Sequence, residues 1–150
     1  MKRQVHAAAG ALGFAVILSF WLSTVVAELT ASAATIALVK NAILWGMIVL
    51  IPALMITGAS GMSLGAGRTG ALLKRKRRRM LLIALNGVLV LAPSAFFLAN
   101  RASAGVFDTW FYGVQGVELA AGALNLFLIG RNIRDGLRMS GRFRRKRAHA

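Results

Sequence analysis

Four long apolar runs constrain this chain more than any other feature of its sequence. They cover about residues 8–28, 35–58, 80–99 and 109–130, and each is close to the ~20 residues that a helix needs to cross a hydrocarbon core of ~30 Å. None alternates between apolar and polar residues as the strands of a membrane barrel do. Inside a bilayer the backbone polar groups must be satisfied within each segment, so the runs predict helices. We therefore expect an all-α fold, a four-helix transmembrane bundle that makes one domain of residues 1–150.

The basic residues gather on one side of this expected bundle. Of the 19 Lys and Arg, two precede the first run, seven lie between the second and third, and eight follow the fourth. Only Lys40 and Arg101 fall on the other side. The positive-inside rule then places both termini and the basic middle connection in the cytoplasm. The sequence predicts an N-in, C-in protein of the bacterial inner (plasma) membrane.

The first 27 residues allow an alternative interpretation. They have a basic start, an apolar stretch and the ending Val25-x-Ala27, which are features of a cleaved signal peptide. The apolar stretch of about 20 residues is longer than the ~7–15 of such peptides. This length favours an uncleaved first helix, whereas cleavage would leave three crossings and a mature start at Glu28.

The basic clusters predict contact with anionic lipid headgroups, which attract juxtamembrane cations by ~1 kcal/mol per residue. Few aromatic residues accompany them, so base stacking has no support and we expect no nucleic acid. In the cytoplasmic tail, residues 131–150, Ile133 and Leu137 alternate with Arg134 and Arg138; this pattern predicts a short interfacial helix at the start of the tail. The residues expected at the headgroups are Lys74, Arg75, Lys76, Arg77, Arg78, Arg79, Arg144, Arg145, Lys146 and Arg147.

Glu118 is the most unusual residue of the apolar runs. It lies near the middle of the fourth run, where a carboxylate costs about 2.5–3.5 kcal/mol on insertion scales. Gln115, Gly122 and Asn125 lie at helical spacings from it and share its face. This polar, small-sided face should be the packed one.

Depth counting at ~1.5 Å per residue suggests partners for that face. Glu118 falls at the depth of Ser94, and Asn125 at the depth of Asn86. Pro93 cannot donate to the carbonyl of Leu89, and we expect a protonated Glu118 to bond to Ser94 or to that carbonyl. We expect Asn125 to bond to Asn86. Both prolines of the chain, Pro52 and Pro93, are expected to break their helices.

Two interpretations of this polar face stay open. One is interhelical bonding with no further role, and the other is a proton or cation relay. The bonding interpretation is favoured because one carboxyl group without a second titratable neighbour makes a poor relay. Glu28 and Lys40 bracket the first periplasmic connection, as Arg101 and Asp108 bracket the second, and each couple could pair across its loop.

The sequence predicts no metal, no cofactor and no catalytic residue. There is no Cys, no nucleophile–base set and no phosphate-binding loop. His6 is a weak candidate ligand whose only fellow histidine is His149 in the tail. Three methionines at helical spacing could offer thioethers to Cu(I): Met47, Met55 and Met62.

Several short motifs carry a resemblance. They are Val5-His6, Phe20-Trp21-Leu22-Ser23-Thr24, Val39-Lys40-Asn41, Ile51-Pro52-Ala53, Thr57-Gly58-Ala59-Ser60-Gly61, Arg79-Met80, Ala84-Leu85-Asn86-Gly87, Glu118-Leu119 and Asn132-Ile133-Arg134-Asp135-Gly136. On these motifs the chain resembles small uncharacterised four-helix inner-membrane proteins of proteobacteria. More distantly it is similar to the copper-resistance D-type membrane domains, which also have a His at the start of a helix.

The leading functional prediction is a non-enzymatic accessory, assembly or scaffold membrane protein. Its expected partners are membrane lipids, with a homo-oligomer or a larger membrane complex as open alternatives. A second hypothesis is a small oligomeric transporter or ion pathway that uses Glu118. A third is a membrane protein that binds haem or copper.

Overall fold

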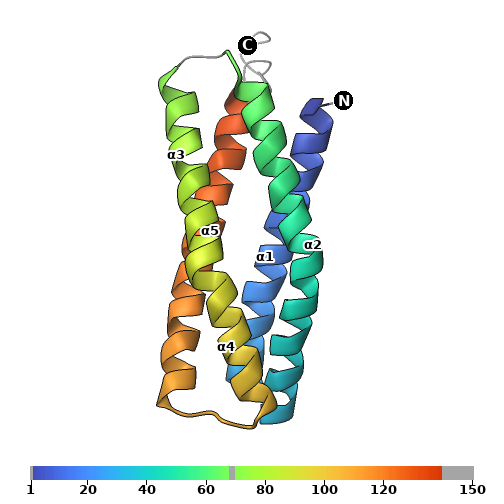
Figure 1. Cartoon of the computed structure of the whole chain (residues 1–150), viewed down its shortest axis with the longest axis vertical. Coiled ribbons are helices and arrows are strands. Elements are labelled where there is room, and N and C mark those ends of the chain that lie inside the picture. The colour runs from blue at the N-terminus through green and yellow to red at the C-terminus, as the bar shows by residue number, and fades with distance from the viewer. Residues whose placement is uncertain (1, 68–69, 140–150) are drawn as a thin grey trace, which may run out of the picture.

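The described residues form four long helices that run antiparallel to their neighbours (Figure 1). The computed structural model describes residues 2–67 and 70–139. Helix α1 covers Lys2–Thr30, α2 Ala33–Gly65 and α5 Thr109–Met139, while the third span joins α3 (Ala71–Asn86), the π-helix η1 (Gly87–Leu91) and α4 (Ala92–Ser103). Within these residues four helices are long and apolar enough to cross a membrane. The prediction of an all-α bundle of four such helices is confirmed.

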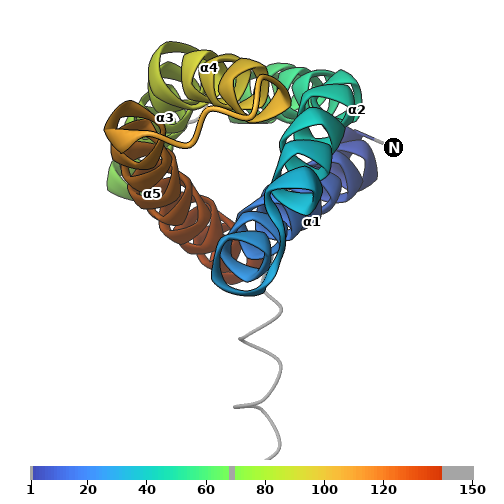
Figure 2. The ribbon, with the colours of Figure 1, turned by 90° about the horizontal axis from the view of Figure 1, so that it is seen from below.

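The four spans stand in a ring rather than in a layer (Figure 2). Helix α1 packs on α2 and α5, α2 also packs on α4, and α5 packs on α3 and α4. Helices α2 and α5 therefore lie diagonally across the bundle. The start of α1, the end of α2, the start of α3 and the end of α5 share one end, here called the basic end (Figure 1). The turn between α1 and α2 and the loop 104–108 share the opposite end.

The bundle is apolar outside and small or polar inside. Large apolar side chains face outward, with Trp45 74% and Leu38 69% exposed, whereas Lys40, Gln115 and Asn125 are at most 4% exposed. A protein surrounded by water does not expose apolar surface on this scale. In a bilayer the lipid covers that surface, and small and polar residues mediate helix packing. The chain is therefore a multi-pass integral membrane protein.

The opposite end contains the best-packed part of the interior. Leu98 and Phe111 are fully buried there against Ala27, Ile36 and Ala102, so α1, α2, α4 and α5 all contribute. The rings of Phe107 and Phe111 meet edge to face at 4.9 Å between centroids.

Asp108 fixes the start of α5 at this end. It accepts a hydrogen bond from the backbone N–H of Phe111 (2.9 Å) and pairs with Arg101, as predicted for the second loop. That N–H and then the guanidinium lower the pKa of Asp108 below its ordinary value. The carboxyl group is therefore ionised at neutral pH, and this cap weakens only as the pH falls through the lowered pKa.

Two predictions about the basic segments are wrong. The stretch Lys74 to Arg79 is not a loop, because α3 already begins at Ala71. The tail does not start with a separate interfacial helix, since α5 continues without a break through Arg131 and Arg138 to Met139. Residues 144–147, also expected at the headgroups, lie outside the described residues.

The prolines do not break their helices as predicted. Pro52 lies inside the continuous helix α2, on an exposed side. Pro93 is the second residue of α4, and α4 directly follows the π-helix η1. A π-turn absorbs an irregularity in the hydrogen-bond ladder without ending the helix.

Gly46 provides a test of the packing between α1 and α2. A Cβ at Gly46 would overlap the Phe20 ring, whereas a Cβ at Gly58 on the same helix would meet nothing within 4 Å. Gly46→Ala should therefore lower stability by about 1–3 kcal/mol, and Gly58→Ala should not lower it. Thermal unfolding of the purified protein in detergent measures both variants. Equal melting temperatures for the two would contradict this packing.

Candidate functional site

The interior is organised around an ion pair between Lys40 on α2 and Glu118 on α5. The Lys40 Nζ donates to Glu118 Oε2 at 2.7 Å, and the side chains are 2% and 13% exposed. Gln115 Nε2, one turn before Glu118, donates to the same oxygen at 3.2 Å. Because α2 and α5 are diagonal to each other, this pair crosses the interior and ties two helices that share no packed face.

Local structure explains why Lys40 points inward. Ser32 caps α2 by accepting from the Thr35 N–H, so the helix starts early enough to place Lys40 two turns inside it. Ile36 and Ile43, one turn to each side, are both buried and share its face. The ammonium group therefore enters the bundle with the apolar side chains around it.

Two predictions about these charges are wrong. Lys40 belongs to a helix interior, and its partner is Glu118 rather than Glu28. Glu118 bonds to Lys40 and Gln115 instead of Ser94 or the carbonyl of Leu89, because an ammonium group attracts a carboxylate more strongly than a neutral donor does. Glu118 lies near the middle of the apolar run 109–130 but in the first third of α5, since the helix extends to Met139.

Glu28 adds a second carboxylate to this cluster. It lies in the last turns of α1 and interacts electrostatically with both Lys40 and Glu118. Its Oε1 is buried and has no hydrogen-bond donor among the described residues, and the same holds for Oε1 of Gln115. The Glu28–Lys40–Glu118 cluster thus consists of the Lys40–Glu118 ion pair and a second carboxyl group nearby, and Oε1 of Glu28 and Oε1 of the adjoining Gln115 are unused acceptors.

The predicted bond between Asn86 and Asn125 is confirmed. Asn86 Nδ2 donates to Asn125 Oδ1 at 2.9 Å and to the carbonyl of Ala121 at 2.9 Å. Asn125 is 2% exposed. This amide pair joins α3 to α5 between the ion pair and the basic end.

The predicted packed face of α5 is also the face that the structure buries. Gln115, Gly122 and Asn125 are buried, and Asn132, one heptad after Asn125, continues the stripe. Gly122 leaves room for Trp21, since a Cβ there would lie 2.9 Å from Cδ1 of the indole. Trp21 Nε1 donates to the carbonyl of Leu119 at 3.0 Å and so ties α1 to this face. Ser94 is buried as well, but Glu118 does not bond to it.

Sequence reasoning missed two contributors to the interior. Trp21 carried no signal, because an indole in an apolar run is indistinguishable from a lipid-facing one. Lys40 did carry one: it stands midway between isoleucines at i−4 and i+3, and a charge between two core positions on one helix face must enter the core.

His6 joins α1 to α2 at the basic end. Its Nδ1 donates to the carbonyl of Thr57 at 3.1 Å and lies 3.0 Å from Ser60 Oγ. Residues 2–67 and 70–139 contain no group of three His, Asp or Glu that could hold a metal ion. Met55 and Met62 are 67% and 65% exposed, which suits contact with lipid rather than a copper site.

The basic end contains a second interhelical ion pair. Arg79 Nη2 on α3 lies 2.6 Å from Asp135 Oδ2 on α5, and each side chain is 14% exposed. Arg77 Nη2 donates to the carbonyl of Gly65 at 2.9 Å. Two of the residues predicted to contact headgroups therefore bond to the protein, while Lys74, Arg75 and Arg78 are exposed.

The ion pair can be tested by breaking it in two ways. Lys40→Met leaves the Glu118 carboxylate buried without its cation, and loss of one partner of a buried pair costs about 3–5 kcal/mol. The double variant Lys40→Met, Glu118→Leu removes both charges and should recover most of this loss. Denaturation in mixed micelles gives the free energy of unfolding of each variant.

A control variant is Arg101→Met, which breaks the more exposed pair with Asp108 and should change stability far less. Additive losses in the Lys40 and Glu118 double variant would contradict a direct interaction between the two side chains.

Comparison with protein-family models, with curated proteins and with solved structures finds no match to this chain.

Proposed function

We propose that this chain is a non-enzymatic inner-membrane protein that serves as an accessory, assembly or scaffold subunit. The observation that carries the proposal is the use of its interior charges in bonds between helices, above all Lys40 with Glu118 across the bundle. Asn86–Asn125 and Arg79–Asp135 brace α3 against α5 in the same way. Such braces give a rigid bundle that presents its apolar outer surface to lipid or to partner helices.

The proposed orientation places the basic end in the cytoplasm. It rests on the basic residues of α1, α3 and α5, because the positive-inside rule counts Lys and Arg close to the ends of the spans. Toward the opposite end the basic residues are Arg101 and the buried Lys40, so few Lys and Arg oppose this orientation.

The Glu28–Lys40–Glu118 cluster supports a second candidate function, a proton pathway. A relay needs more than one titratable group, and here a second carboxyl group, that of Glu28, interacts electrostatically with both members of the Lys40–Glu118 pair. The unused Oε1 of Glu28 can take up a proton, and Oε1 of Gln115 can accept a hydrogen bond from a water. Asn125 and Asn132 continue the buried polar stripe of α5 towards the basic end.

The orientation can be tested with single cysteines, because the natural chain has none. Ala104→Cys lies in the loop of the opposite end, and Ala66→Cys follows α2 at the basic end; both positions are exposed. In intact cells a membrane-impermeant maleimide should label Cys at position 104 and leave position 66 unlabelled until the membrane is opened. The reverse pattern would overturn the proposed orientation.

The two functions differ in proton flux. Proteoliposomes that contain the wild-type protein and an internal pH dye should equilibrate a pH gradient no faster than empty liposomes if the chain is a scaffold. A proton pathway predicts faster equilibration that Glu118→Gln and Glu28→Gln abolish, while Asp108→Asn, which changes a carboxyl group outside the interior, retains it. The first result supports the scaffold, and the second replaces it with the pathway.

A further inference from the structure

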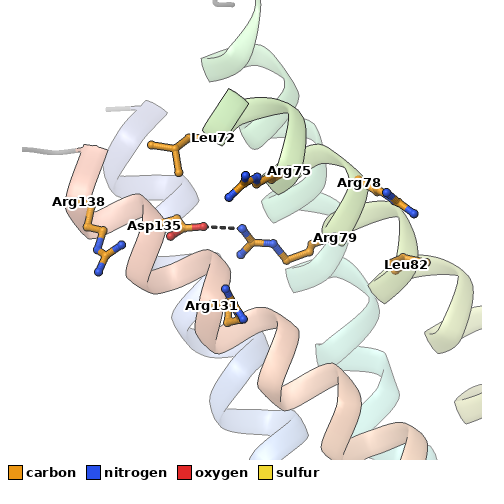
Figure 3. A pocket seen from close by; sticks show the side chains of 8 residues that line it. All are labelled: Leu72, Arg75, Arg78, Arg79, Leu82, Arg131, Asp135 and Arg138. Carbon is orange, nitrogen blue, oxygen red and sulfur yellow. Dashed lines mark hydrogen bonds and ion pairs between the residues drawn. The ribbon is translucent and has the colours of Figure 1, made fainter. Parts of the chain in front are cut away.

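A cavity lined by arginines opens between α3 and α5 at the basic end (Figure 3). Its volume is about 350 Å³. Its lining residues are Leu72, Arg75, Arg78, Arg79, Leu82, Arg131, Asp135 and Arg138. Five of the eight lining residues are arginines and one is an aspartate, so the lining has a large excess of positive charge.

The arginines of this cavity are only partly used by the protein. Arg79 Nη2 donates to Asp135 Oδ2, but Arg79 Nη1 is buried without a hydrogen-bond partner among the described residues. The Arg131 guanidinium lies over the Phe127 ring at 5.6 Å, which holds it beside the cavity. Arg75 and Arg79 both point from α3 toward α5, whereas Arg78 points outward (Figure 3). Cations brought together in this way favour an anion between them.

An apolar groove continues from the cavity towards the middle of the bundle. It lies between α3–η1 and α5, has a volume of about 350 Å³, and shares Leu82 with the arginine cavity. Its other lining residues are Leu85, Asn86, Leu89, Val90, Leu124 and Leu128. Leu89 is 67% and Leu124 49% exposed, so the groove opens towards the lipid rather than into the bundle.

We propose that the cavity and the groove together bind one anionic glycerophospholipid. Its phosphate lies among Arg75, Arg79 and Arg131, and one acyl chain lies in the groove below Leu82. Arginine matches phosphate because its planar donors make paired, charge-assisted hydrogen bonds. Basic pockets between membrane helices bind lipid headgroups on the same principle.

The shape of the site selects a lipid over other anions and over a partner helix. A free phosphate would use the arginines and leave the apolar groove unfilled. A helix from a second copy would fill the groove but bring no phosphate to the unpaired Nη1 of Arg79. Only an amphipathic ligand with an anionic head and an apolar tail uses both parts. The site rests on the embedding of the helices in a bilayer and not on the scaffold or the proton pathway.

Native mass spectrometry tests this site on the full chain. Delipidated protein in detergent is titrated with phosphatidylglycerol and, separately, with phosphatidylcholine of the same acyl chains. We expect one phosphatidylglycerol per chain to be retained in preference to phosphatidylcholine. Inorganic phosphate at the same concentration should neither bind nor displace the lipid.

Two matched pairs of substitutions locate the binding. Arg75→Gln, Arg131→Gln removes two charges from the cavity and should weaken phosphatidylglycerol retention about tenfold or more. Lys74→Gln, Arg134→Gln removes two exposed charges from the same helices outside the cavity and should leave retention within about twofold. Leu124→Trp, which fills the groove without changing charge, should weaken retention in the same direction as the cavity variant.

Three results would overturn the proposal. If both double charge variants weakened phosphatidylglycerol retention equally, the arginines would act only as part of a diffuse positive surface charge. If phosphatidylglycerol and phosphatidylcholine were retained equally, the site would not recognise the anionic headgroup. A dimer that the cavity variant dissociates would assign the groove to a second copy of the chain.

Discussion

The ion pair between Lys40 and Glu118 is the interaction on which the arrangement of this bundle depends. It joins the two helices that lie diagonally across the ring, and it does so with 2.7 Å between charged atoms in the interior. Inside a bilayer, apolar side chains alone do not determine which face of a helix points into the bundle, because lipid tails are as apolar as leucine. Each charge is costly to bury and is tolerated because the other is there. The pair therefore selects one rotation of α2 and of α5 in which both charges point inward.

The remaining polar contacts extend this selection along α5. Towards the basic end the helix meets α1 through Trp21, α3 through the Asn86–Asn125 pair, and α3 again through Arg79–Asp135. One face of α5 thus bonds to three other spans at successive depths. The opposite end is held by packing of Leu98 and Phe111. The outer surface is left for lipid, and the groove between α3 and α5 gives that lipid a defined place.

The sequence was sufficient for the four spans and for part of the interior. Length and continuous hydrophobicity predict the helices, because the bilayer permits few other structures. The Asn86–Asn125 bond followed from depth counting, since both residues lie a few turns from helix ends marked by arginines. The partner of Glu118 does not follow, because Lys40 lies beside the expected first loop and depth does not fix the rotation of a helix. The extent of α3 and α5 was missed for a related reason: long basic side chains continue a helix beyond the hydrocarbon core while their charged groups stay in the headgroup region.

The protonation state of Glu118 in a bilayer tests the central ion pair most directly. Infrared difference spectroscopy between the wild-type protein and Glu118→Gln in liposomes isolates the signal of this one carboxyl group. An ion pair predicts the carboxylate bands at neutral pH, and in a Lys40→Met background it predicts the C=O stretch of a protonated carboxylic acid instead. A protonated Glu118 in the wild-type protein, unchanged by the loss of Lys40, would contradict the ion pair.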